Sequence, residues 1–206
     1  MAVAHRDVTY KTRKRRKDVA MTTGEYLGTP ETLLPAELAY GVMRVADAPA
    51  VRHQRMVGDL FKALDAHVAR YGLGEVLLAP TDVILDYDSA LVVQPDLLFV
   101  SSERADIVAD NVHGAPDLVV EVLSPHPRIG KLDERVGWFA KYGVRECWLA
   151  DLRERRYSIL SLGPRGVLNR QLCSGGGVAP STVLPGVTLP EFSAGHSFPR
   201  RESLEG

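Results

Sequence analysis

The chain has 206 residues, a length that suits one well-buried domain and is short for two. Hydrophobic residues make up 45% of the chain and charged residues 25%, which excludes the disordered, collagen-like and disulfide-rich classes. The formal net charge of −1 hides an asymmetry, because six of the seven residues at positions 11–17 are lysine or arginine. This basic tract is either a nucleic-acid-binding arm or a solvated leader ahead of the folded domain.

Several functional classes lack support in the sequence. No apolar run approaches the ~18 residues of a membrane span, and the N-terminus has no apolar segment of a secretory signal. We interpret Cys147 and Cys173 as reduced thiols of a cytoplasmic protein, with a disulfide as the alternative. There is no phosphate loop, no GxGxxG after a strand, no GxSxG elbow, no CxxC zinc pattern and no HExxH.

The first third of the chain alternates polar and periodic segments. Residues 1–20 have no apolar periodicity, and we predict a basic leader without fixed structure. A capping-box pattern predicts a short helix over residues 23–27. Residues 37–45 are predicted as a first strand broken by a glycine, and apolar residues at helical spacing predict a helix over residues 50–71.

The rest of the chain mixes strands and helices. We predict strands over residues 75–78, 82–85, 91–100, 118–123, 145–151 and 156–161, a short helix or turn up to residue 109, and a helix over residues 129–142. This order favours an α/β fold in which a mixed central β-sheet is flanked by α-helices. Residues 21–193 would form this single domain, and residues 194–206 would be a tail without fixed structure.

Two of the predicted strands each contain a carboxylate that apolar packing cannot explain. Asp96 lies in the apolar run of residues 91–100, and Glu121 lies in that of residues 117–123. A buried ionised carboxylate is costly unless a metal, a cation or several hydrogen bonds hold it. A shared divalent cation such as Mg²⁺ is the simplest common partner, because it binds oxygen ligands and keeps several waters. The alternative is that Asp96 caps a turn and Glu121 pairs with an arginine.

Two cationic side chains follow the second acid along the chain. Lys131 and Arg135 lie four residues apart in the predicted helix and therefore share a face. Either of them can reach back towards the end of the strand that contains Glu121. The alternative is that they are surface partners of the acids next to them in the helix.

Three further polar residues are weaker candidates. Glu37 lies in or before the first strand, where a solvated edge residue is the alternative. His53 opens the long helix, a position at which histidine is more often structural. His126 directly follows the strand that contains Glu121, so a role in a site there is open.

Three segments of the sequence resemble the Uma2 family of restriction-endonuclease-like proteins. They are residues 94–100 (QPDLLFV), 115–125 (APDLVVEVLSP) and 142–149 (YGVRECWL), within a resemblance that covers roughly residues 22–192. The resemblance implies a nuclease fold of the PD-(D/E)xK type. It also implies that Asp96 is the acid of the PD pair, that Glu121 is the second metal ligand, and that Glu37 matches the family's first-strand glutamate.

The sequence departs from this family pattern at one position. The lysine expected two residues after the second acid is Leu123 here. The family commonly places a lysine in the following helix instead, where Arg135 stands, and Lys131 lies one turn earlier. Arginine matches the charge of lysine but cannot act as a base, so the identity of the cation is open.

These observations lead to a first functional hypothesis and two alternatives. The first is an endonuclease that hydrolyses DNA phosphodiester bonds with Mg²⁺ or Mn²⁺ held by Asp96 and Glu121, with Glu37 assisting and with Lys131 or Arg135 stabilising charge. The alternatives are an inactive nuclease-fold protein that binds nucleic acid or a protein partner, and an oligomeric structural protein. We expect DNA as the partner, no membrane, and a homodimer.

Overall fold

The computed structural model describes residues 20–30, 34–123 and 131–192. All but the last residue of the predicted leader, the whole of the predicted tail, and His126 lie outside these residues. The helices are α1 (Thr23–Leu27), α2 (Val51–Tyr71), the 3₁₀ helix η1 (Ser102–Ile107) and α3 (Leu132–Tyr142). The strands are β1 (Ala36–Ala39), β2 (Val42–Val45), β3 (Gly74–Leu78), β4 (Val83–Asp86), β5 (Leu91–Val93), β6 (Leu97–Ser101), β7 (Val112–His113), β8 (Leu118–Leu123), β9 (Glu146–Asp151), β10 (Arg156–Gly163) and β11 (Gly166–Cys173).

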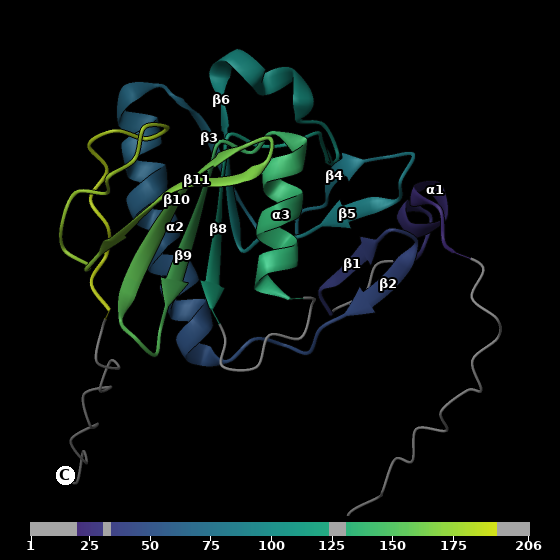
Figure 1. Ribbon diagram of the computed structural model, residues 1–206, viewed down its shortest axis with the longest axis horizontal. Helices are drawn as coiled ribbons and strands as arrows, with labels where there is room; N and C mark the ends of the chain where they lie inside the picture. Colours follow the sequence, from purple (N-terminus) through teal and green to yellow (C-terminus); the bar gives the residue numbers. More distant parts are fainter. Residues whose placement is uncertain (1–19, 31–33, 124–130, 193–206) are drawn as a thin grey trace, which may run out of the picture.

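The strands form two mixed sheets (Figure 1). The six-stranded sheet has the order β11-β10-β9-β8-β6-β3, in which β8 and β9 are parallel and the other neighbours are antiparallel. The five-stranded sheet has the order β2-β1-β5-β4-β7, and only its β4–β7 pair is parallel. The predicted fold class, a mixed sheet flanked by helices, is confirmed.

Helices α2 and α3 lie on opposite faces of the six-stranded sheet (Figure 1). Successive side chains of a strand point to opposite faces. Accordingly, Leu118 and Val120 of β8 pack in the apolar cluster under α2, whereas Val119 packs in the cluster under α3. Glu121 follows this alternation, so it points to the α3 side, where an apolar residue would be expected.

Two predicted strands are each divided in the structure. The apolar run of residues 91–100 contains β5 in one sheet and β6 in the other, and Pro95 lies between them. Proline has no N–H to donate to a ladder, which fits a change of sheet at this point. The predicted first strand is the β1–β2 hairpin. Strands β7 and β11 were not predicted, while the boundaries of α2 and β8 agree with the prediction within one residue.

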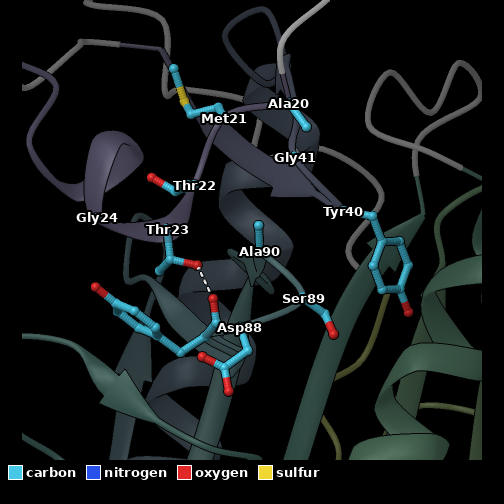
Figure 2. A pocket seen from close by; sticks show the side chains of 11 residues that line it. Ala20, Met21, Thr22, Thr23, Gly24, Tyr40, Gly41, Asp88, Ser89 and Ala90 are labelled. Atoms are coloured by element: carbon cyan, nitrogen blue, oxygen red, sulfur yellow. Dashed lines mark hydrogen bonds between the residues drawn. The ribbon is translucent and has the colours of Figure 1, made fainter.

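The β1–β2 hairpin turns at Tyr40 and Gly41, which both have positive φ. Gly41 is required there, because a Cβ on it would lie 2.6 Å from the Cβ of Ala20. Figure 2 shows the cleft that this turn forms with the start of α1 and the β4–β5 turn. The cleft has a volume of about 400 Å³, and none of the residues that line it is a lysine, arginine or histidine.

Candidate active site

Four polar side chains from different elements meet beside the N-terminal half of α3. Glu37 comes from β1, Glu121 from β8 and Arg135 from α3, and Asp96 lies in the connection from β5 to β6. The sheet switch at Pro95 therefore brings Asp96 to the strand that contains Glu121. Lys131 stands at the N-cap of α3 and is exposed, and no described residue forms a salt bridge with it.

Arg135 joins the two glutamates. Its Nη1 donates to Glu37 Oε2 at 2.5 Å, its Nη2 donates to Glu121 Oε1 at 2.6 Å, and its Nε donates to the same oxygen at 3.1 Å. Arg135 is 6% exposed and Glu37 is 1% exposed. Charges this deeply buried are tolerated only when they are paired and hydrogen-bonded, so the three residues form one structural unit.

The protonation of this unit follows from burial and from its neighbours. Burial raises the pKa of Glu121 to about 7, the charge of Arg135 opposes this rise, and the charges of Asp96 and Glu37 add to it. Burial lowers the pKa of Arg135, but the two glutamates more than offset this and leave its pKa above the ordinary value. Arg135 is therefore a permanent cation, and Glu121 changes its protonation near neutral pH.

Both oxygens of Glu37 are occupied. Oε2 accepts from Arg135, and Oε1 accepts the backbone N–H of Gln94 at 2.7 Å. The side chain of Gln94 is itself fixed, because Nε2 donates to Asp82 Oδ1 at 2.9 Å and Oε1 accepts from the amide of Ala36 at 3.2 Å. Sequence reasoning missed Gln94, although it opens the conspicuous Gln-Pro-Asp segment. It holds the glutamate that orients Arg135.

Asp96 is anchored through one oxygen. Its Oδ2 accepts the backbone N–H of Val122 at 2.7 Å and lies 3.2 Å from Nε2 of His53, in the first turn of α2. Burial lowers the pKa of His53, but the hydrogen bond and charge of Asp96 more than offset this and raise its pKa. Within residues 20–30, 34–123 and 131–192, His53 Nδ1 is the buried side-chain atom without a hydrogen-bond partner.

The remaining oxygens of the two candidate metal ligands have no such anchors. No residue in the described part of the chain donates to Asp96 Oδ1 or to Glu121 Oε2. Each carboxylate is thus fixed through one oxygen, and its other oxygen accepts no hydrogen bond from the described residues. Leu123 packs at the edge of the apolar cluster under α3, so the position of the expected lysine belongs to the core in this chain.

Comparison with known proteins agrees with this architecture. The model of the Uma2 family, described as "Putative restriction endonuclease", matches residues 24–191. The chain belongs to the Uma2 family. The predicted resemblance is therefore confirmed, and family membership together with the fold supports a nuclease that acts on nucleic acid.

The fold of this Uma2 protein is also found among solved structures. One of them is the crystal structure of a putative nuclease belonging to DUF820 from Anabaena variabilis, and it superposes with a TM-score of 0.70 at 18% sequence identity. The match covers 84% of this chain and 95% of the other. No curated protein matches the chain significantly. In the described segments, no helix is both long enough and apolar enough to cross a membrane.

Proposed function

We propose that this Uma2 protein is a metal-dependent endonuclease that hydrolyses DNA phosphodiester bonds. The observation that carries the proposal is the pair of half-anchored carboxylates. Asp96 and Glu121 are each held through one oxygen, by Val122 and His53 or by Arg135, and their other oxygens have no donor among the described residues. Such an arrangement positions two carboxylate oxygens that no described residue satisfies, and a shared cation would bind them and favour the ionised form of Glu121.

The chemistry of these donors fits a hard divalent cation. Mg²⁺ and Mn²⁺ prefer carboxylate oxygens, and Mg²⁺ is commonly held by one or two carboxylates together with waters and a substrate phosphate. No group of three or more His, Cys, Asp or Glu side chains suited to a metal occurs in the described ranges, so we assign two ligands, Asp96 and Glu121, to the described residues. When bound, such an ion polarises a phosphoryl oxygen and lowers the pKa of its water.

Arg135 supplies the positive charge that the family pattern assigns to a lysine. Three of its five N–H groups are engaged with Glu37 and Glu121, which leaves two for a phosphate oxygen. It cannot take up a proton, so it would stabilise charge on the phosphate and could not activate water. We assign Glu37 the role of orienting Arg135, and we prefer Arg135 to the exposed Lys131 as the cation of the site.

One observation favours the alternative of a nuclease-fold protein that binds nucleic acid without cleaving it. Arg135 already neutralises Glu121, and the position of the usual lysine is filled by Leu123. When an arginine of the same site already compensates the charge of the acids, these residues can serve the stability of the fold without any catalytic role. In that case DNA would bind without turnover.

The decisive experiment is cleavage of supercoiled, linear and single-stranded DNA by the full chain with Mg²⁺ or Mn²⁺. We expect cleavage that EDTA abolishes and that Asp96→Asn and Glu121→Gln each reduce by at least about a hundredfold. Glu75→Gln is the matched control, because Glu75 is exposed and lies outside the site. Cleavage that persists in Asp96→Asn, or none with any substrate, would contradict the proposal.

Two attributes accompany the proposal. An enzyme that acts on chromosomal or invading DNA would work in the cytoplasm, and the buried thiol of Cys147 is suited to a reducing compartment. We also propose a homodimer, which light scattering of the purified chain tests directly.

A further inference from the structure

The turn between β1 and β2 holds an exposed aromatic residue in an unfavourable backbone conformation. Tyr40 has a φ of 49° and is 44% exposed. Two-residue hairpin turns with positive φ strongly prefer asparagine, aspartate or glycine at this position, and a bulky residue there is an outlier. Burial does not compensate for the strain, because almost half of the residue is in solvent. Retained strain of this kind is typical of functional positions.

A lysine ammonium lies beside this ring. Lys141 Nζ is 5.9 Å from the centroid of the Tyr40 ring and 4.7 Å from that of Tyr142. Lys141 is exposed, its Nζ donates to the hydroxyl of Tyr142 at 3.1 Å, and no carboxylate of the described residues lies within 4.0 Å of it. Arg44, by contrast, is paired with Glu134 at 3.2 Å. The charge of Lys141 thus has no carboxylate partner among the described residues, and its remaining N–H groups can meet an anion from outside.

The other neighbours of Tyr40 leave part of its ring uncovered. The indole of Trp138 meets the Tyr40 ring nearly perpendicularly, at 83° and 5.9 Å between centroids. Figure 2 shows that the Tyr40 side chain points away from the other labelled residues of the cleft. The ring is thus supported at one side and still partly exposed, as a stacking platform must be.

This tyrosine–lysine pair is close to the candidate active site. Strand β1 and helix α3 lie side by side, because Glu37 contacts Arg135 and Tyr40 contacts Trp138. Tyr40 is three residues beyond Glu37, or about 10 Å along a strand, and Lys141 is six residues beyond Arg135, or about 9 Å along a helix.

We propose that Tyr40 and Lys141 form a nucleotide-binding surface for an unpaired DNA strand. A base stacks on the Tyr40 ring, and the adjacent phosphate contacts the Lys141 ammonium. Only a base outside a duplex stack can lie on a side-chain ring, so the substrate class is single-stranded or locally unpaired DNA. The inference rests on the proposed function, because it takes the DNA at the candidate active site as the occupant.

The test is the fluorescence anisotropy of a labelled oligonucleotide and of its duplex, with the full chain in EDTA. Salt at about 0.3 M weakens the purely ionic contribution of the basic N-terminal tract. We expect tighter binding of the single strand, and a loss of at least about fivefold in Tyr40→Gly. Glycine tolerates the positive φ, so the melting temperature should stay the same or rise by about 2–4 °C. A purely structural tyrosine would instead lose melting temperature and keep its affinity for DNA.

The matched control is Tyr71, another exposed tyrosine with a cation beside it. Tyr71 is 58% exposed, and the Arg70 guanidinium lies 5.5 Å from its ring centroid at the end of α2. Tyr71→Ala should bind as the wild type does, Tyr40→Phe should retain affinity, and Lys141→Ala should lose affinity and salt dependence. Asparagine also adopts the positive φ of this turn, so Tyr40→Asn removes the ring without straining the backbone. This variant replaces Tyr40→Gly in the test if the glycine variant does not fold.

The possible results distinguish a failure of the proposed Tyr40–Lys141 surface from a failure of the proposed nuclease activity. Equal single-strand affinity of Tyr40→Gly and the wild type, a loss shared by Tyr71→Ala, or a preference for the duplex would each overturn the surface. Because binding is measured without metal, a ring-dependent affinity in a protein that never cleaves DNA supports the surface and removes only the proposed nuclease. Cleavage of single strands that is undiminished in Tyr40→Gly overturns the surface and leaves the nuclease.

Discussion

Arg135 donates from both Nε and Nη2 to a single oxygen of Glu121, Oε1, at 3.1 and 2.6 Å. A bidentate arginine commonly divides its donors between the two oxygens of a carboxylate. Here the third donor goes to Glu37 instead, and Glu121 Oε2 receives no bond from the described residues. Arg135 thereby compensates the buried charge of Glu121 through Oε1. Glu121 Oε2 keeps its lone pairs for a ligand.

Arg135→Lys should lower the free energy of unfolding by about 1–3 kcal/mol, because one ammonium cannot reproduce three bonds to two buried glutamates. Urea denaturation measures this loss. Arg44→Lys is the control, since its pair with Glu134 is 29% and 41% exposed and should contribute less than about 1 kcal/mol. Equal losses in the two variants would show that the buried bridge is no more important than a surface pair.

Glu121 should give the stability of the protein a characteristic pH dependence. Its folded pKa is about 7 and its ordinary value is 4.5, so the contribution to stability is complete below about 4.5 and is lost as the pH rises through 7. We expect the free energy of unfolding to fall across this range by on the order of 3 kcal/mol. Glu121→Gln should flatten this part of the profile, whereas the exposed Glu75→Gln should not. If the free energy of unfolding of Glu121→Gln still falls over this pH range, other titrating groups cause the decrease.

The elements that the sequence predicted well are those whose pattern is local. The long amphipathic helix α2 and the apolar strand β8 were placed within a residue, because periodicity and flanking glycine or proline set their limits. The acids Asp96 and Glu121 were singled out for the same reason, since a carboxylate inside an apolar run is visible without a structure, and their role as metal ligands stays a prediction. The capping box at the start of α1 was likewise confirmed.

The missed features depend on partners distant in sequence. Strand β11 has few buried residues, so its apolar and polar side chains follow no useful period. Nothing local separates β5 from β6 except Pro95, whose effect on the choice of sheet depends on β1 and β8. The choice between Lys131 and Arg135 could not be made, because their spacing of four residues predicted one helix face for both. This prediction was wrong: α3 begins at Leu132, Lys131 is its extended and exposed N-cap, and only Arg135 is buried.

Glu146 is a buried acid that sequence reasoning did not single out, and it should fasten the segment after β11. Its carboxylate accepts hydrogen bonds from Trp148 Nε1, Ser181 Oγ, the amide and hydroxyl of Thr182, and the amide of Val183. Glu146→Gln turns one acceptor into a donor that faces other donors, which should cost about 1–3 kcal/mol. Hydrogen exchange should show faster exchange at Thr182 and Val183 than in the wild type.

The control for this anchor is the exposed Glu75→Gln, which should change neither stability nor exchange by a measurable amount. A global loss of stability without locally faster exchange would mean that Glu146 supports the sheet as a whole. Unchanged stability in Glu146→Gln would show that its five donors are equally well satisfied by an amide, against the geometry observed here.

His53 should position Asp96 for the proposed cation. Its Nε2 and the Val122 amide hold Asp96 Oδ2 and so direct Oδ1 away from these donors. His53→Leu should weaken Mn²⁺ binding, measured by calorimetry without DNA, by about 10–100-fold, as is usual for lost support of a metal ligand. His53→Gln places an N–H near the position of Nε2 and should retain most of the affinity. His67→Leu, in the same helix but in contact with Tyr71, should bind as the wild type does. Equal losses in His53→Leu and His53→Gln would mean that the imidazole acts through packing, and undiminished binding in both would mean that Asp96 needs no support from α2.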